Sequence, residues 1–87
     1  MNRRDERYFL TTSLLLAIFL YAKEQQVAGI HPTEDFSKKE FAFVRSDHRL
    51  DELVEIYKFG DKSDPELLVP VHTYEYARNT LLDRLNQ

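Results

Sequence analysis

The pattern of apolar and polar positions divides the 87-residue chain into extended and helical segments. Runs rich in aromatic and β-branched residues favour strands, whereas apolar residues spaced three and four apart favour helices. This pattern predicts an α+β fold with a three- to four-stranded antiparallel sheet and three helices, in the order β-α-β-β-α-(β)-α. The expected segments are a strand at Arg7–Leu10, a helix from Leu14 to about Gln25, strands at Val27–Thr33 and Lys39–Arg45, a helix with Leu50, Leu53, Val54 and Tyr57 on one face, a possible short strand at Leu67–Val71 and a final helix.

Residues that begin and end helices agree with these segments. Hydroxyl groups at Thr11–Ser13 can cap the first helix, Ser46 or Asp47 the second, and Thr73 the third. Gly60 is expected to end the second helix. The chain has no internal repeat and few glycines or prolines, so we expect residues 1–87 to form a single domain.

The strand at Lys39–Arg45 has two different faces. Phe41 and Phe43 alternate with Ala42 and Val44, so rings lie on one face and small side chains on the other. We expect two helices to pack over Ala42 and Val44, and the third helix to cover the ring face, because burying phenylalanine contributes about 2–3 kcal/mol per ring. Alternatively, the third helix lies along a sheet edge and the rings stay open to solvent.

The same strand resembles a known nucleic-acid-binding signature. KEFAFVR, at residues 39–45, is similar to the RNP1 pattern of RNA-recognition-motif domains, in which aromatic rings stack on bases. The resemblance implies that single-stranded nucleic acid binds on the sheet, although Glu40 replaces a glycine of the pattern. Residue by residue, it implies stacking by Phe9, Phe41 and Phe43, and phosphate or base contacts by Lys39 and Arg45.

The first helix is apolar on nearly all sides between Leu14 and Ala22. Such a helix is buried on more than one side within its own chain, or it buries one side in a partner. A chain of this size has little surface with which to cover it. We therefore expect a protein partner or a second copy of the chain to bind there, and the candidate interface residues are Leu15, Ile18, Phe19 and Ala22.

The amino-acid composition narrows the classes of function that the protein can have. The net charge is −3, which differs from a strongly basic nucleic-acid binder, and the absence of cysteine excludes thiol nucleophiles and cysteine-ligated metals. His48 and Glu52 lie one helical turn apart, but two ligands do not define a metal site. We find no catalytic constellation, no cofactor-binding motif and no small-molecule site, so we expect a protein that is not an enzyme.

The N-terminal region resembles a secretory signal in having arginines before an apolar run. Asp5 and Glu6 dilute its positive charge, and three hydroxyl residues at 11–13 interrupt the apolar run. The remaining run, Leu14–Ala22, is shorter than the ~20 residues that span a bilayer. We therefore expect a cytoplasmic protein without a membrane segment.

A second resemblance covers most of the chain. Its elements are an aromatic first strand ending in threonine, a Leu-x-x-Ala-x-x-Leu helix, a Phe-x-Phe strand and a final Tyr/Arg/Leu helix. Together they resemble a family of small bacterial and phage domains of unknown function, which implies a compact, stand-alone and often phage-derived domain. The matching positions are Thr11, Leu14, Ala17, Leu20, Phe41, Phe43, Tyr76, Arg78, Leu81 and Leu85. The sequence thus predicts a small interaction module that binds a protein or itself; the alternative is single-stranded nucleic-acid binding.

Overall fold

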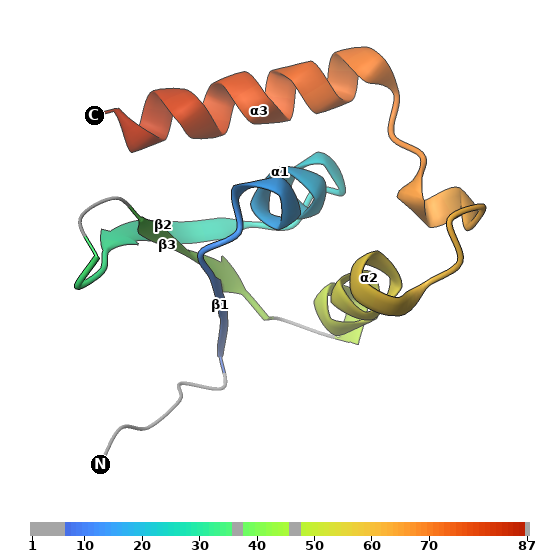
Figure 1. Ribbon diagram of the computed structural model, residues 1–87, viewed down its shortest axis with the longest axis horizontal. Helices are drawn as coiled ribbons and strands as arrows, with labels where there is room; N and C mark the ends of the chain where they lie inside the picture. The colour runs from blue at the N-terminus through green and yellow to red at the C-terminus, as the bar shows by residue number, and fades with distance from the viewer. Residues whose placement is uncertain (1–6, 36–37, 46–47, 87) are drawn as a thin grey trace.

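The computed structural model describes residues 7–35, 38–45 and 48–86. These residues form a three-stranded antiparallel sheet and three α-helices in the order β-α-β-β-α-α, which confirms the predicted α+β fold. Figure 1 shows α1 at the centre, between the sheet, α2 and α3. The elements are β1 (Tyr8–Thr11), α1 (Leu14–Ala22), β2 (Val27–Pro32), β3 (Lys39–Val44), α2 (His48–Phe59), the 3₁₀-helix η1 (Pro65–Leu67) and α3 (Val71–Leu85).

The sheet has the order β1-β3-β2, so the strand with the phenylalanines is central. Phe9 of β1 lies opposite Phe43, and Leu10 lies opposite Ala42. Val27 of β2 also lies opposite Phe43, and the pairing shifts by one residue between Val27 and Gly29. Because directly opposed residues point to the same face, Phe9, Val27 and the β3 rings share one face of the sheet.

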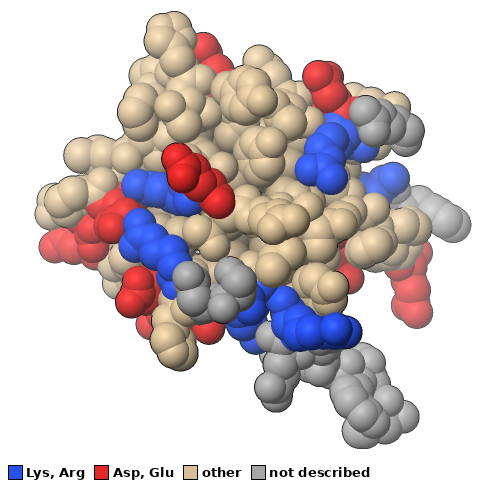
Figure 2. Space-filling model, turned by 180° about the vertical axis from the view of Figure 1, so that it is seen from behind, with Lys and Arg blue, Asp and Glu red and all other residues tan. Residues whose placement is uncertain are grey.

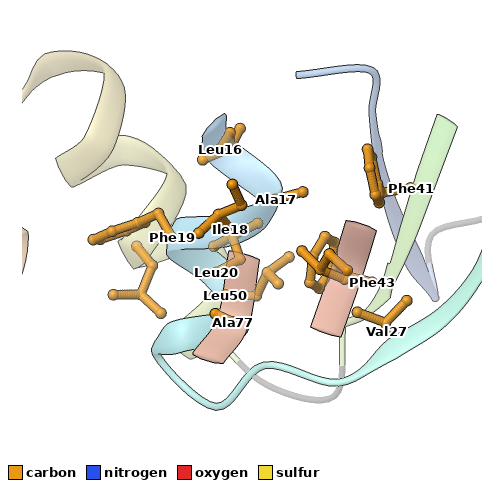
Figure 3. Close-up of a cluster of buried hydrophobic side chains, with 12 residues drawn as sticks. Leu16, Ala17, Ile18, Phe19, Leu20, Val27, Phe41, Phe43, Leu50 and Ala77 are labelled. Carbon is orange, nitrogen blue, oxygen red and sulfur yellow. The ribbon is translucent and has the colours of Figure 1, made fainter. Parts of the chain in front are cut away.

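The ring face is the face that the helices cover, which corrects the predicted arrangement. Phe41 and Phe43 are 2% and 0% exposed and belong to one core together with residues of all three helices. Figure 3 shows both rings directed from β3 toward α1. The prediction that helices cover both faces of the sheet is therefore wrong. Ala42 and Val44 do not lie beneath helices, and α3 packs on the same face of the sheet as the other two helices. One helical layer on the ring face buries the largest side chains with the fewest elements.

The central position of α1 explains its apolar character on all sides. Five consecutive residues, Leu16 to Leu20, are buried. At its start, the Leu16 N–H donates to the hydroxyl of Ser13 over 3.1 Å, as the capping prediction requires. α1 packs against α3 along much of its length, and it also contacts α2. The chain itself therefore covers most of this apolar helix.

α1 ends earlier than predicted. The N–H of Gln25 donates to the carbonyl of Leu20 and that of Glu24 to Tyr21, which together form a Schellman motif. Glu24 has a φ of 69°, a left-handed conformation that most non-glycine residues avoid. The sequence has no glycine at this position, and the prediction therefore extended the helix to Gln25.

α2 ends at Phe59, as the glycine at position 60 predicts. The Gly60 N–H donates to the Ile56 carbonyl over 2.9 Å. A Cβ at Gly60 would lie 2.6 Å from that carbonyl oxygen, so this close approach requires glycine. The predicted caps of α2, Ser46 and Asp47, lie outside the described residues.

The connection to α3 differs from the prediction in two ways. Residues 67–71 do not form a strand with the described sheet; η1 and an extended segment occupy this region. Pro65 and Pro70 both lack an N–H, which disfavours strand pairing here. α3 begins at Val71 with Pro70 as its N-cap, not at Thr73, because the Tyr74 N–H already bonds the Pro70 carbonyl over 2.9 Å.

Candidate protein-interaction surface

The aromatic rings that resemble RNP1 are not accessible for stacking. Phe41 and Phe43 are buried in the core, and Phe9 is half-buried beside them. Lys39 is exposed at one end of β3, whereas Arg45 follows the other end and its Nε lies 3.2 Å from the Asp51 carboxylate. The structure therefore does not assemble the five predicted nucleic-acid contacts on one open surface.

The four predicted interface residues of α1 separate in the structure. Ile18 and Phe19 are 1% and 5% exposed, because α2, α3 and the sheet enclose this part of α1. Ala22 is half-buried, whereas Leu15 is 60% exposed. Ile18, which is 1% exposed and does not line a described groove, is therefore inaccessible to a partner in this fold.

Leu15 lies at an apolar groove that we call the α1–α2 groove. Its volume is about 320 Å³. The Phe19 and Tyr57 rings meet in its wall, with centroids 5.2 Å apart and planes inclined by 40°. Three segments far apart in the sequence build it, from α1, the end of α2 and the region from η1 to α3. The lining residues are Leu15, Phe19, Tyr57, Leu67, Val69 and Tyr74.

An ionic cluster fixes η1 beside this groove. Glu66 Oε1 accepts from Arg49 Nη2 over 2.9 Å and from Lys23 Nζ over 3.3 Å. Arg49 belongs to α2 and Lys23 directly follows α1, so one carboxylate joins three elements. These hydrogen bonds, first from Arg49 and then from Lys23, lower the pKa of Glu66. The cluster thereby positions the next residue, Leu67, in the groove wall.

Large apolar side chains are also exposed in the part of the chain that contributes Tyr57, Leu67, Val69 and Tyr74 to the groove. Phe59 is 77% exposed, Leu68 and Val71 are each 69% exposed, and Tyr76 is 67% exposed. All four lie between the end of α2 and the middle of α3. Figure 2 shows that uncharged atoms dominate the centre and upper part of the back of the molecule, while charged side chains lie mainly toward its margins.

The second face of the sheet carries no described helix, and we call it the open sheet face (Figure 1). It contains a shallow hollow of about 350 Å³. Leu10 is 48% exposed there, whereas Ala42 is 5% exposed. The hollow is lined by Tyr8, Leu10, Ala28, His31, Glu40 and Ala42.

The polar residues of α2 form surface ion pairs. Glu52 lies 3.8 Å from Arg49, and His48, its predicted partner, is exposed. Asp51 and Glu52 keep 52% and 63% of their side-chain surface exposed. Within the ranges that the structure describes, no group of three His, Asp or Glu residues could hold a metal ion. The described helices also include none that is long and apolar enough to cross a membrane.

Sequence reasoning identified Leu15 but missed most of the groove. Tyr57 was expected on the buried face of α2, and Leu67 and Val69 in a short strand. The sequence shows that these three residues are apolar or aromatic. That they meet beside α1 depends on how η1 packs against the helices, which the sequence does not show. Comparisons of the chain with known protein families, curated proteins and solved structures gave no match, so both sequence resemblances remain predictions.

Proposed function

We propose that this chain is a non-catalytic interaction module that binds an apolar segment of a protein in the α1–α2 groove. The observation that carries the proposal is the exposure of Leu15, which is 60% accessible on a helix whose other residues are buried or half-buried. A leucine at such a position costs solvation free energy in the free protein, and a partner that covers it recovers that free energy.

The form of the groove supports a protein segment as the ligand. Its volume of about 320 Å³ lies at the lower end of the range for pockets that bind ligands. Its walls are aliphatic and aromatic, and two of the lining residues, Tyr57 and Tyr74, also carry a hydroxyl group. Tyrosine is enriched in protein interfaces because it combines a large apolar surface with a polar group.

The ionic cluster makes the groove a prepared site. Because Glu66 joins Arg49 and Lys23, the η1 wall is held against α1 and α2 before a partner arrives. A site that is already ordered costs less conformational entropy on binding. We infer that the partner inserts apolar side chains from a helix or loop, as in other helix-in-groove complexes.

A random peptide library displayed on phage tests this proposal. The selected peptides would be synthesised with a fluorophore, and their binding to the full chain measured by anisotropy. We expect enriched peptides with leucine, isoleucine or aromatic anchors, and we expect Leu15→Lys to weaken their binding at least about tenfold. The matched control is Leu10→Lys, which places the same charge at another exposed leucine, on the open sheet face.

Two outcomes contradict the proposal. Peptides that bind the wild type and Leu15→Lys equally well do not use the groove. A library that yields no peptide sensitive to Leu15→Lys shows that the groove does not select an apolar segment.

A further inference from the structure

The outer edge of β1 is a hydrogen-bonding surface that the sheet leaves open. β1 is an edge strand, since the sheet order is β1-β3-β2. The Arg45 N–H donates to the Arg7 carbonyl over 2.8 Å, so Arg7 and Arg45 form a hydrogen-bonded pair. Such pairs alternate along an antiparallel ladder, and Phe9 and Thr11 therefore also bond β3. The backbone groups of Tyr8 and Leu10 then point away from β3.

The two edges of the sheet differ in how well they are protected from pairing. β2 carries an irregularity between Val27 and Gly29, and it ends at Pro32, which has no N–H. Both features interrupt strand addition. β1 consists of Tyr8–Thr11, with the sequence YFLT; it has no charge, proline or irregularity in its pairing. Among the described strands, β1 pairs with β3 alone.

We propose that two copies of the chain pair antiparallel through the outer edges of β1 and join their sheets into one continuous sheet. A twofold axis at Phe9 brings Tyr8 opposite Leu10 of the second copy, and Leu10 opposite Tyr8. These are the residues whose backbone groups point outward, so each pair exchanges two N–H···O bonds. We propose a second copy as the partner because, in this register, the outward N–H and C=O groups of one β1 strand meet those of the other.

Side chains on both faces support the same register. On the open sheet face, Leu10, which is 48% exposed, meets the ring of Tyr8 of the second copy. On the helical face, the two half-buried Phe9 rings become direct neighbours, and aromatic cross-strand pairs stabilise antiparallel sheets. The Arg7 guanidinium lies 5.7 Å from the centre of the Tyr8 ring, and Arg7 stands opposite Thr11 of the second copy, so the described residues of the two strands do not oppose like charges.

Disulfide trapping tests the register directly, because the chain has no cysteine of its own. Arg7 and Thr11 of opposite copies form a non-hydrogen-bonded pair, in which Cα atoms lie about 4.5 Å apart, within disulfide range. We expect a mixture of Arg7→Cys and Thr11→Cys chains to form the mixed disulfide under mild oxidation. Neither variant alone should form a disulfide, because the two cysteines at position 7, or the two at position 11, of a dimer would lie about four residues apart along the paired strands.

Sedimentation and hydrogen exchange test the dimer without relying on a variant. We expect the wild-type chain to show a concentration-dependent monomer–dimer equilibrium. We also expect the amides of Tyr8 and Leu10 to become protected from exchange as concentration rises, while Phe9 and Thr11 are protected throughout. Leu10→Pro removes one outward N–H per copy and should weaken dimerisation by at least about tenfold, since the twofold axis doubles each loss.

The outcomes separate this inference from the proposed groove function. A chain that remains monomeric at millimolar concentration overturns the dimer, and a dimer without the mixed disulfide overturns this pairing. Leu15→Lys changes the groove but not β1, so we expect it to leave dimerisation unchanged. A dimer abolished by Leu15→Lys, and not by Leu10→Pro, shows that the copies associate through the groove instead.

Discussion

The two faces of the sheet carry apolar side chains in similar number but differ in what covers them. On the ring face, Phe41 and Phe43 are buried beneath helices and belong to the hydrophobic core. On the open sheet face, Leu10 is 48% exposed beside a hollow, and no described helix covers it. The same strand, β3, contributes to both faces. Alternation along a strand therefore establishes that two faces exist, but not which one becomes the core.

Side-chain size explains the outcome. A phenylalanine buries far more apolar surface than an alanine, so one helical layer stabilises the fold most when it covers the rings. The small residues then face outward at little cost. This comparison suggests that substitutions on the ring face should destabilise the protein severely, whereas matched substitutions on the open sheet face should not.

Truncation of neighbouring β3 residues tests the comparison most strongly. Phe43→Ala should reduce the free energy of unfolding by about 3–5 kcal/mol, because it leaves a cavity in the core. Val44→Ala, the next residue on the opposite face, should cost no more than about 1 kcal/mol, because Val44 is only half-buried. Urea unfolding followed by circular dichroism measures both values. Equal losses would show that the open sheet face is also packed.

Enlarging an alanine in the core and an alanine on the open sheet face should give a smaller difference in the free energy of unfolding. Ala17 of α1 is fully buried in the core, and Ala17→Leu should cost about 1–3 kcal/mol through overpacking. Ala42→Leu adds the same atoms beside the hollow of about 350 Å³ on the open sheet face. Ala42 is itself only 5% exposed, but the hollow beside it leaves room for the added atoms, so we expect a smaller loss in the free energy of unfolding than at Ala17. A large loss at Ala42 would mean that the hollow is closed in solution.

The end of α1 provides a stabilising substitution. Glu24→Gly should raise the free energy of unfolding by about 1 kcal/mol, because glycine adopts the left-handed conformation at Glu24 without a steric cost. Glu34→Gly is the control: it shortens another exposed glutamate and should not stabilise the fold. Thermal unfolding of the three proteins would show a higher midpoint for Glu24→Gly alone. A lower midpoint would indicate that the Glu24 side chain itself stabilises the turn.

Much of the fold could be predicted from the sequence because local signals and periodicity agreed. The helix-capping serine, the glycine after α2 and the alternation in β3 each act within a few residues. The predictions that were wrong concerned which elements pack against one another. The order of residues does not state which face of β3 the helices cover, and the apolar residues at Leu67 and Val69 fit both a strand and the groove wall. Burial of Ile18 likewise depends on how α2 and α3 close around α1.

The ionic cluster on the helical side should contribute least to stability, because its groups are partly exposed to solvent. The pKa of Glu66 is lowered in the folded state, so its pairing stabilises the protein above the ordinary pKa of about 4.5. This contribution is lost as pH falls through the lowered value. Glu66→Gln should therefore lower the unfolding midpoint at pH 7, while the difference from the wild type should vanish near pH 2. Glu75→Gln is the control at an exposed glutamate outside the cluster. An equal difference at both pH values would show that Glu66 acts through packing and not through its charge.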